Sequence, residues 1–339
     1  MTKTDDQRLK LLTQWVQDVL GEPEIQCTPA SGDASFRRYF RIAAPSGVWI
    51  AMDAPPAQEP LTPFLCVAAL LRKIGLNVPT IVERDEARGF LLISDLGNRQ
   101  YLHALANASR PEYIQLYTDA ITALVKLQSH GGAFASELPP YSAALLTAEL
   151  ELFREWYLQR HLGIELDTAA TKLWRGLVAD LVQAALAQPR VAVHRDYHSR
   201  NLMLVTVNNP GILDFQDAVF GPITYDLVSL LEDCYIALPE SMERELIELY
   251  RTCAREAGVS VPKHDEFSVG YDLMGMQRHL KAAGIFARLN HRDGKPGYLA
   301  DIPLTLAYVL RAARRNACCR SFADFLREQV PAAISVQLQ

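Results

Sequence analysis

Hydrophobic residues recur at helical spacing over most of the chain and at strand spacing only near its beginning. Residues 5–20 carry leucines, valines and a tryptophan at helical intervals, which predicts an amphipathic helix that ends at Gly21. Residues 25–54 and 80–94 contain short apolar runs between turn residues, and these predict an antiparallel sheet. The pattern therefore predicts a small sheet-rich part followed by a large helical part.

The helical part is expected to contain several amphipathic helices with apolar residues on one face. They are predicted at residues 60–74, 111–129, 147–161, 168–188, 227–236, 303–319 and 322–330. Most aromatic residues of these helices are expected in the core. A minority could instead line a pocket for a small-molecule substrate.

Two polar segments, 193–204 and 212–217, interrupt the apolar pattern. In the first, Asp196 is followed five residues later by Asn201, and Asp214 comes thirteen residues after that. This H-R-D-x-x-x-x-N spacing followed by D-F is that of kinase phosphoryl-transfer sites. A carboxylate at Asp196 would orient the attacking hydroxyl and accept its proton. Asn201 and Asp214 would hold Mg²⁺ against the phosphates of ATP.

Either segment alone is as well explained by a polar loop between two core strands, but both at this spacing favour a kinase. The two segments resemble those of the aminoglycoside phosphotransferase-like kinases, and residues 221–227 resemble a further Gly-x-Pro-x-x-Asp-Leu element of that family. The resemblance implies that Asp226 braces the catalytic loop from behind without touching substrate and that His194 gives structural support.

The family resemblance implies an α+β, bilobal protein-kinase-like fold, with a small antiparallel β-sheet N-lobe and a large, mainly helical C-lobe. The N-lobe is expected at 1–94, a hinge at 95–98 and the C-lobe at 99–339. A turn of small residues at 31–35 would let backbone N–H groups approach the phosphates. The residues expected to contact the nucleotide there are Gly32 and Ser35, and those expected at the adenine edge are Ile93, Ser94 and Leu96.

The first strands depart from the wider kinase pattern, which places a lysine there, paired with a glutamate on the next helix. Met52 occupies the region where the lysine is expected, and the helix at 60–74 has no glutamate in its interior. Arg38 falls on an otherwise apolar strand face, so it needs a partner, and ATP could be that partner. Arg37 and Arg41 fall on the other face and could equally be solvated.

Segments 32–41 and 51–56, together with 277–281 and 284–288, resemble a bacterial branch of this superfamily. Its members are anomeric sugar kinases that act on N-acetylmuramate and N-acetylglucosamine in peptidoglycan (cell-wall) recycling. The branch lacks the strand lysine. The resemblance implies transfer of the ATP γ-phosphoryl group to the anomeric hydroxyl, and a functional link to a sugar-1-phosphate uridylyltransferase.

Residues 277–298 are rich in basic side chains on an otherwise acidic chain. The segment has five basic residues and one acidic residue, which predicts either a solvated basic face or a site for an anionic acceptor. N-acetylmuramate carries a lactyl carboxylate, whereas an aminoglycoside is polycationic, so the charge favours the amino-sugar acid. Arg278 and Lys281 are the candidate acceptor-binding residues, and Asp217 could contact the metal or a sugar hydroxyl or cap a local turn.

Charge and composition restrict the remaining possibilities. The net charge of −5 argues against a nucleic-acid-binding protein, and no apolar run is long enough to insert into a membrane. The N-terminus lacks the apolar core of a signal peptide, so a cytoplasmic location is expected. The six cysteines form no C-x-x-C pair and are expected to be free thiols.

Two alternatives remain beside the sugar kinase. The first is a phosphotransferase for an aminoglycoside or for choline, against which the basic segment argues. The second is a nucleotide-binding pseudokinase that acts as a regulator. The absent lysine favours this second alternative, and the complete set of Asp196, Asn201 and Asp214 argues against it.

Overall fold

The computed structural model describes residues 3–31 and 36–330 and divides into two compact units. The first unit extends to Arg99 and includes the later segment Met203–Asp217; the second contains Gln100–Leu202 and the chain from Ala218 on. The first stretch of the first unit ends next to the predicted hinge at 95–98, which stays a prediction. Residues 203–217 belong to the first unit although much of the second unit precedes them in the chain, so no single boundary in the sequence separates the two units.

The first unit contains a five-stranded antiparallel sheet with the strand order β1-β2-β3-β5-β4. Its strands are β1 (Gln26–Ser31), β2 (Arg38–Ala44), β3 (Gly47–Asp53), β4 (Ile81–Asp85) and β5 (Phe90–Ser94), and its helices are α1 (Lys3–Leu20) and α2 (Thr62–Lys73). The pairing of β2 with β3 sets Arg38 opposite Asp53. Two side chains in this relation lie on the same face of the sheet and interact directly.

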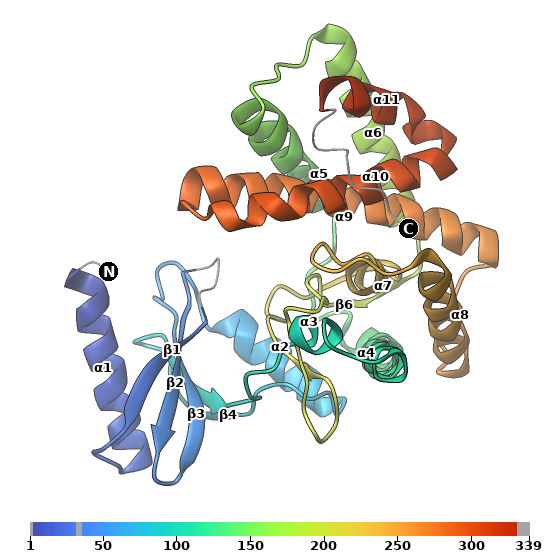
Figure 1. Cartoon of the computed structure of the whole chain (residues 1–339). Helices are drawn as coiled ribbons and strands as arrows, with labels where there is room; N and C mark the ends of the chain where they lie inside the picture. Colours follow the sequence, from blue (N-terminus) through green and yellow to red (C-terminus); the bar gives the residue numbers. More distant parts are fainter. Residues whose placement is uncertain (1–2, 32–35, 331–339) are drawn as a thin grey trace. The chain divides into compact units, whose positions relative to one another are not determined.

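Helix α1 covers one face of this sheet (Figure 1). Its residues Leu12, Trp15 and Val16 are buried against apolar side chains of β2, β3 and β5. The segment 203–217 is attached through the backbone, since the Ile212 N–H donates to the Asn77 carbonyl at 2.7 Å. This segment contains β8 (Gly211–Ile212), which pairs with β7 (Leu202–Met203).

The second unit is mainly helical, with one two-stranded antiparallel ribbon, β6 (Arg190–Val193) and β9 (Val219–Pro222). Its helices are α3 (Tyr101–Leu105), α4 (Arg110–Gly131), α5 (Ala143–Leu152), α6 (Thr168–Leu186), α7 (Tyr225–Leu231), α8 (Glu240–Glu256), α9 (His264–Asp293), α10 (Ile302–Arg315) and α11 (Arg320–Gln329). The model and the sequence pattern therefore agree on the fold class, a small antiparallel sheet region followed by a helical remainder.

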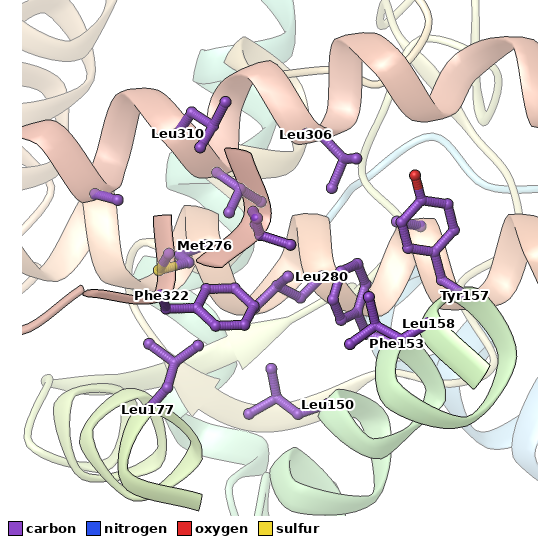
Figure 2. Packing of buried hydrophobic residues seen from close by; sticks show 14 of the residues in the cluster. Leu150, Phe153, Tyr157, Leu158, Leu177, Met276, Leu280, Leu306, Leu310 and Phe322 are labelled. Carbon is purple, nitrogen blue, oxygen red and sulfur yellow. The ribbon is translucent and has the colours of Figure 1, made fainter. Parts of the chain in front are cut away.

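Helix α9 lies at the centre of the second unit's core. Figure 1 shows it running beside α10, and Figure 2 shows side chains converging from α5, α6, α9, α10 and α11. Met276 and Leu280 of α9 are fully buried in this core. The six cysteines are all free thiols, as the sequence predicted.

Three predicted helices differ from the structure in their extent. The helix expected at 303–319 is α10, which ends at Arg315 and is followed by a short 3-10 helix at Ala317–Cys319. The helix expected at 147–161 is α5 followed by a π-helical segment, η2 (Phe153–His161). The helix expected at 227–236 is α7, which ends at Leu231. It is followed by Asp233, whose Oδ1 accepts the N–H of Tyr235 at 3.0 Å. A local bond between an aspartate and the backbone two residues on favours a turn over a continued helix.

The change to π-helical winding falls where Gly284 of α9 packs against the backbone at the end of α5. A Cβ atom added at Gly284 of α9 would lie 2.4 Å from the backbone carbon of Leu152 and 2.5 Å from the nitrogen of Phe153. No side chain can be accommodated there without moving the two helices apart. Glycine is therefore required at this position by packing.

We expect Gly284→Ala to destabilise the protein by about 1–3 kcal/mol, the usual cost of overpacking a core. Gly176→Ala in α6 is the matched control, because its added methyl group meets nothing within 4 Å. Alanine in a helix is more favourable than glycine, so the control should be neutral or stabilising. Thermal unfolding of both variants checks this; equal melting temperatures would contradict the packing argument.

Candidate active site

The loop that carries Asp196 follows strand β6 in the second unit, and a buried carboxylate holds its first residues. Asp226, in the first turn of α7, accepts the backbone N–H of His194 at 2.6 Å and that of Arg195 at 3.0 Å. Burial raises the pKa of Asp226 to about 7, although the two N–H donors favour its charged form. Asp226 thus lies behind the loop, where the sequence predicted it.

The far end of the loop is held by contacts that the sequence did not indicate. Asp233, two residues after α7, accepts the N–H of Ser199 at 2.9 Å. The Ser199 carbonyl accepts the N–H of Leu102, and the Arg200 carbonyl accepts the side-chain amide of Gln100 at 2.8 Å. Carboxylates from the α7 region therefore fix the loop at both ends.

A second buried carboxylate, Glu149 of α5, binds the loop through the side chain of Arg195. Glu149 also accepts hydrogen bonds from Tyr141 and from Gln277 at 3.0 Å, and its Oε1 lies 3.1 Å from the Nζ of Lys281. Burial by itself would raise the pKa of Glu149, but Lys281 and Arg195 outweigh burial and hold the pKa below its ordinary value. Glu149 is therefore an ionised anchor under the catalytic loop.

Asp196 is held as a carboxylate chiefly by the buried cations near it. Burial favours the neutral acid, but Lys281, followed by His198 and Arg195, lowers the pKa of Asp196 below its usual value. Burial lowers the pKa of His198 itself, so the ring contributes only when it is protonated. The side-chain amide of Asn201 donates to the Asp196 carbonyl at 3.0 Å, which ties the two residues of the motif together. Arg195 has a positive φ of 76°, a conformation uncommon outside glycine and often found at functional sites.

We expect Glu149→Gln to destabilise the fold by about 3–5 kcal/mol, because removing one partner leaves buried charges on Arg195 and Lys281 uncompensated. The folded-state pKa of Glu149 is lowered, so its contribution is present at neutral pH and is lost as the pH falls through that value. Glu151→Gln, on the same helix but with its side chain 36% exposed, is the control. Chemical denaturation at pH 7 measures both, and equal stabilities would contradict the anchor role.

Asp214 lies in the first unit, directly before the buried Phe215. The ring of Phe215 packs on Phe64 of α2, with 4.8 Å between the centroids. Asp214 has a φ of 60°, and its Oδ1 accepts a hydrogen bond from the side-chain amide of Gln216 at 2.7 Å. Asp217 is exposed. Asn201 and Asp214 offer an amide oxygen and a carboxylate, the hard oxygen ligands that Mg²⁺ prefers.

The arginines of the 36–41 region have partners within the first unit, which changes the expectation for Arg38. Arg38 Nε donates to Asp53 Oδ2 at 3.0 Å, and Arg8 of α1 donates to the other oxygen at 2.9 Å. The free-energy cost of placing the Arg38 charge on an apolar strand face is therefore offset by Asp53, and a contact with ATP is not needed to explain why an arginine is found there. Arg37 pairs with Glu59 and Arg41 with Asp95.

Of the two alternatives for residues 277–298, one solvated basic face is contradicted by the structure, and a site for an anionic acceptor stays a prediction. Arg278 and Lys281 are buried, whereas Arg292 is paired with Asp293 outside the core. The charge of Lys281 is already balanced by Glu149. Arg278 donates to Cys234 Sγ at 3.5 Å.

The residues predicted at the adenine edge lie at the end of β5. Ile93 pairs with both β3 and β4. The Ser94 N–H donates to the Thr80 carbonyl at 2.9 Å, so it would have to break that bond to donate to adenine. Leu96 lies beyond the sheet, with its side chain near Gly211. Gly32 and Ser35 are outside the described residues.

The chain matches the model of the Phosphotransferase enzyme family over residues 26–259, well over half of its length. The chain belongs to this phosphotransferase family. It therefore belongs to a family of phosphoryl-transfer enzymes, in agreement with the Asp196 motif. In the residues that the structure describes, no helix is both long and apolar enough to cross a membrane.

Two relatives are similar to this phosphotransferase over nearly their whole length. The N-acetylmuramate/N-acetylglucosamine kinase of Pseudomonas putida is 45% identical over 336 residues, covering 95% of this chain and 97% of the relative. The kinase of the same name from Pseudomonas aeruginosa is 44% identical over 324 residues, covering 92% and 94%. An ADP-bound aminoglycoside phosphotransferase, 15% identical, has the same fold, with a TM-score of 0.59 and coverage of 89% and 97%.

Proposed function

We propose that the chain is an ATP-dependent kinase that phosphorylates the anomeric hydroxyl of N-acetylmuramate and N-acetylglucosamine. The observation that carries the proposal is the 44–45% identity to kinases named for these two sugars, over more than 90% of both chains. The fixed Asp196 loop supplies the chemistry that this reaction needs.

In the proposed reaction, the anomeric oxygen attacks the γ-phosphorus of ATP in line with the bond to the β–γ bridging oxygen. That bond breaks, ADP leaves, and the proton of the sugar hydroxyl passes to Asp196. Most of the rate enhancement comes from alignment and charge stabilisation, since phosphoryl transfer needs little covalent help from the protein. The bonds from Asp226 and Asp233 keep the loop in one geometry during this step.

Asn201 and Asp214 are the residues proposed to hold Mg²⁺. When bound, Mg²⁺ would neutralise charge on the nucleotide phosphates. The proposed nucleotide contacts are Gly32, Ser35, Ile93, Ser94 and Leu96; Arg38 is left out of this set because Asp53 balances its charge. The proposed acceptor contacts are Asp217, Arg278 and Lys281, and Lys281 would contact the acceptor while it stays paired with Glu149.

The sugar 1-phosphate that this reaction yields is a substrate for nucleotidyl transfer, which supports a functional link to a uridylyltransferase in peptidoglycan recycling. A cytoplasmic location belongs to the same proposal, because ATP is the phosphoryl donor.

A transfer assay with Mg-ATP tests the function against N-acetylmuramate, N-acetylglucosamine, glucose, kanamycin and choline, with NMR of each product. An anomeric phosphate on the two N-acetyl sugars is the expected result. Phosphorylated kanamycin or choline would instead favour the alternative class of phosphotransferase. ATP binding without any product would favour a regulator that binds nucleotide and does not turn it over.

A further inference from the structure

Arg200 lies four residues after Asp196 in the catalytic loop. Aromatic rings cover the face of its guanidinium, and the N–H groups at its edge make no hydrogen bond within the described residues. Its Cζ lies 3.6 Å from the ring centroid of Tyr235 and 5.4 Å from that of Tyr298. Its ion-pair partner Asp301 is 3.8 Å away, which is longer than a hydrogen bond. The stacked rings orient the guanidinium, and its side chain is 34% exposed, so a ligand can reach its edge.

Arg278 of α9 is a second cation close to the same segment. Only 5% of the residue is exposed, and its guanidinium donates to the Sγ of Cys234, the neighbour of Tyr235 in the chain. The nearby carboxylates of Asp233 and Asp196 favour its charged form, but no described carboxylate forms an ion pair with its guanidinium. An anionic ligand would offset the remaining cost of burying this charge.

Both arginines adjoin the catalytic loop. The ring of His198, in that loop, contacts Tyr235 with 5.4 Å between centroids. Its Nδ1 is buried and has no hydrogen-bond partner in the described part of the chain. The opposing carboxylates are Asp301, at its long distance from Arg200, Asp233, which already accepts the N–H groups of Ser199 and Tyr235, and the catalytic candidate Asp196, which acts on Arg278 and His198. An acceptor carboxylate would therefore meet guanidinium edges here.

We propose that Arg200 binds the lactyl carboxylate of N-acetylmuramate, with Arg278 adding a second positive charge, and thereby favours this sugar over N-acetylglucosamine. The inference rests on the proposed function, since it places the anomeric hydroxyl at Asp196. A planar guanidinium that is already held in place binds a carboxylate through two parallel hydrogen bonds. Lys281, the other cation near Asp196, is paired with Glu149 and does not serve this purpose.

The first measurement is kcat/KM of Arg200→Gln for the two sugars. A hydrogen bond to a charged group is worth about 1.5–3 kcal/mol, so we expect a loss of about 10- to 100-fold with N-acetylmuramate. N-acetylglucosamine has no lactyl group, and its kcat/KM should change by less than about three-fold. Arg327→Gln, which removes an arginine paired with Asp324 on α11, is the control and should change neither value.

The second measurement uses the methyl ester of N-acetylmuramate, which keeps the lactyl group and removes its charge. Replacing the acid by the ester should lower kcat/KM of the wild-type enzyme about as much as Arg200→Gln lowers kcat/KM for the acid. The variant should have similar kcat/KM values for acid and ester. Such a coupling between variant and ligand would not arise from a purely structural role. The comparison of acid with ester in the wild-type enzyme does not depend on whether Arg200→Gln folds. If that variant folds poorly, Arg200→Lys keeps the positive charge and should show an intermediate loss of kcat/KM with the acid.

An equal loss with both sugars, or no loss with either, would overturn the assignment of Arg200. Equal rates of acid and ester in the wild-type enzyme would also overturn it. A different result marks failure of the proposed function itself: the wild-type enzyme would phosphorylate neither N-acetyl sugar.

Discussion

Replacing Asp196 by asparagine is expected to lower kcat by about 10²- to 10⁴-fold, the usual contribution of a positioned general base. The amide keeps the shape of the carboxylate but cannot accept the hydroxyl proton. The cations that lower the pKa of Asp196 hold it ionised at neutral pH, so the wild-type group is ready to orient and deprotonate the acceptor. The KM for ATP should change little, because Asp196 acts on the acceptor.

Two comparisons separate this loss of chemistry from a loss of fold. The thermal midpoint of Asp196→Asn should stay close to that of the wild-type protein, since the loop remains fixed by Asp226 and Asp233. Asp167→Asn is a matched control, because Asp167 caps α6 by accepting the N–H of Ala170, which asparagine also does. A kcat of Asp196→Asn close to that of the wild-type enzyme would show that Asp196 is not the catalytic base.

Replacing Asp214 by asparagine is expected to lower kcat by about 10³-fold, because charge stabilisation by a metal ion is worth several kcal/mol. Asparagine is the informative substitution, since Asp214 has a φ of 60° and asparagine tolerates this left-handed conformation better than alanine does. The backbone is thus preserved and the metal-binding charge is removed.

The readout that identifies a metal ligand is the Mg²⁺ dependence. Asp214→Asn should need a higher Mg²⁺ concentration for half-maximal activity, and added Mg²⁺ should restore part of the rate. Asp85→Asn, at the last residue of β4, is the control and should leave the Mg²⁺ dependence unchanged. An unchanged dependence in Asp214→Asn would assign the metal to other ligands.

The sequence predicted the catalytic loop well because its chemistry depends on neighbours in the chain. Asp196 and Asn201 lie in one loop and are joined by a hydrogen bond. Asp226 accepts hydrogen bonds from backbone N–H groups of the same loop, which do not depend on side-chain identity. The strands, and most helices to within a few residues, followed from hydrophobic periodicity for the same reason. The end of α7 was misplaced because a side chain, Asp233, competes with the helix for backbone N–H groups.

Pairings between distant residues could not be predicted. Arg195 meets Glu149 across 46 positions of the chain, and nothing in either local sequence indicates the other. The solvated alternative for the basic segment failed for a related reason, because other helices enclose α9, bury Arg278 and Lys281, and pair Lys281 with Glu149. A periodic pattern describes one helix and does not say what surrounds it.

By itself, then, the sequence determined the two parts of the fold and the residue types of phosphoryl transfer, because periodicity and motif spacing are properties of neighbouring residues. The tertiary structure decided which charges act and which are neutralised. It gave Arg38 to Asp53 and Lys281 to Glu149, and it held Arg200 against Tyr235 with its edge accessible. The physical reason is that the free energy of a buried charge depends on the groups within a few ångströms, and folding brings those groups from distant positions in the chain.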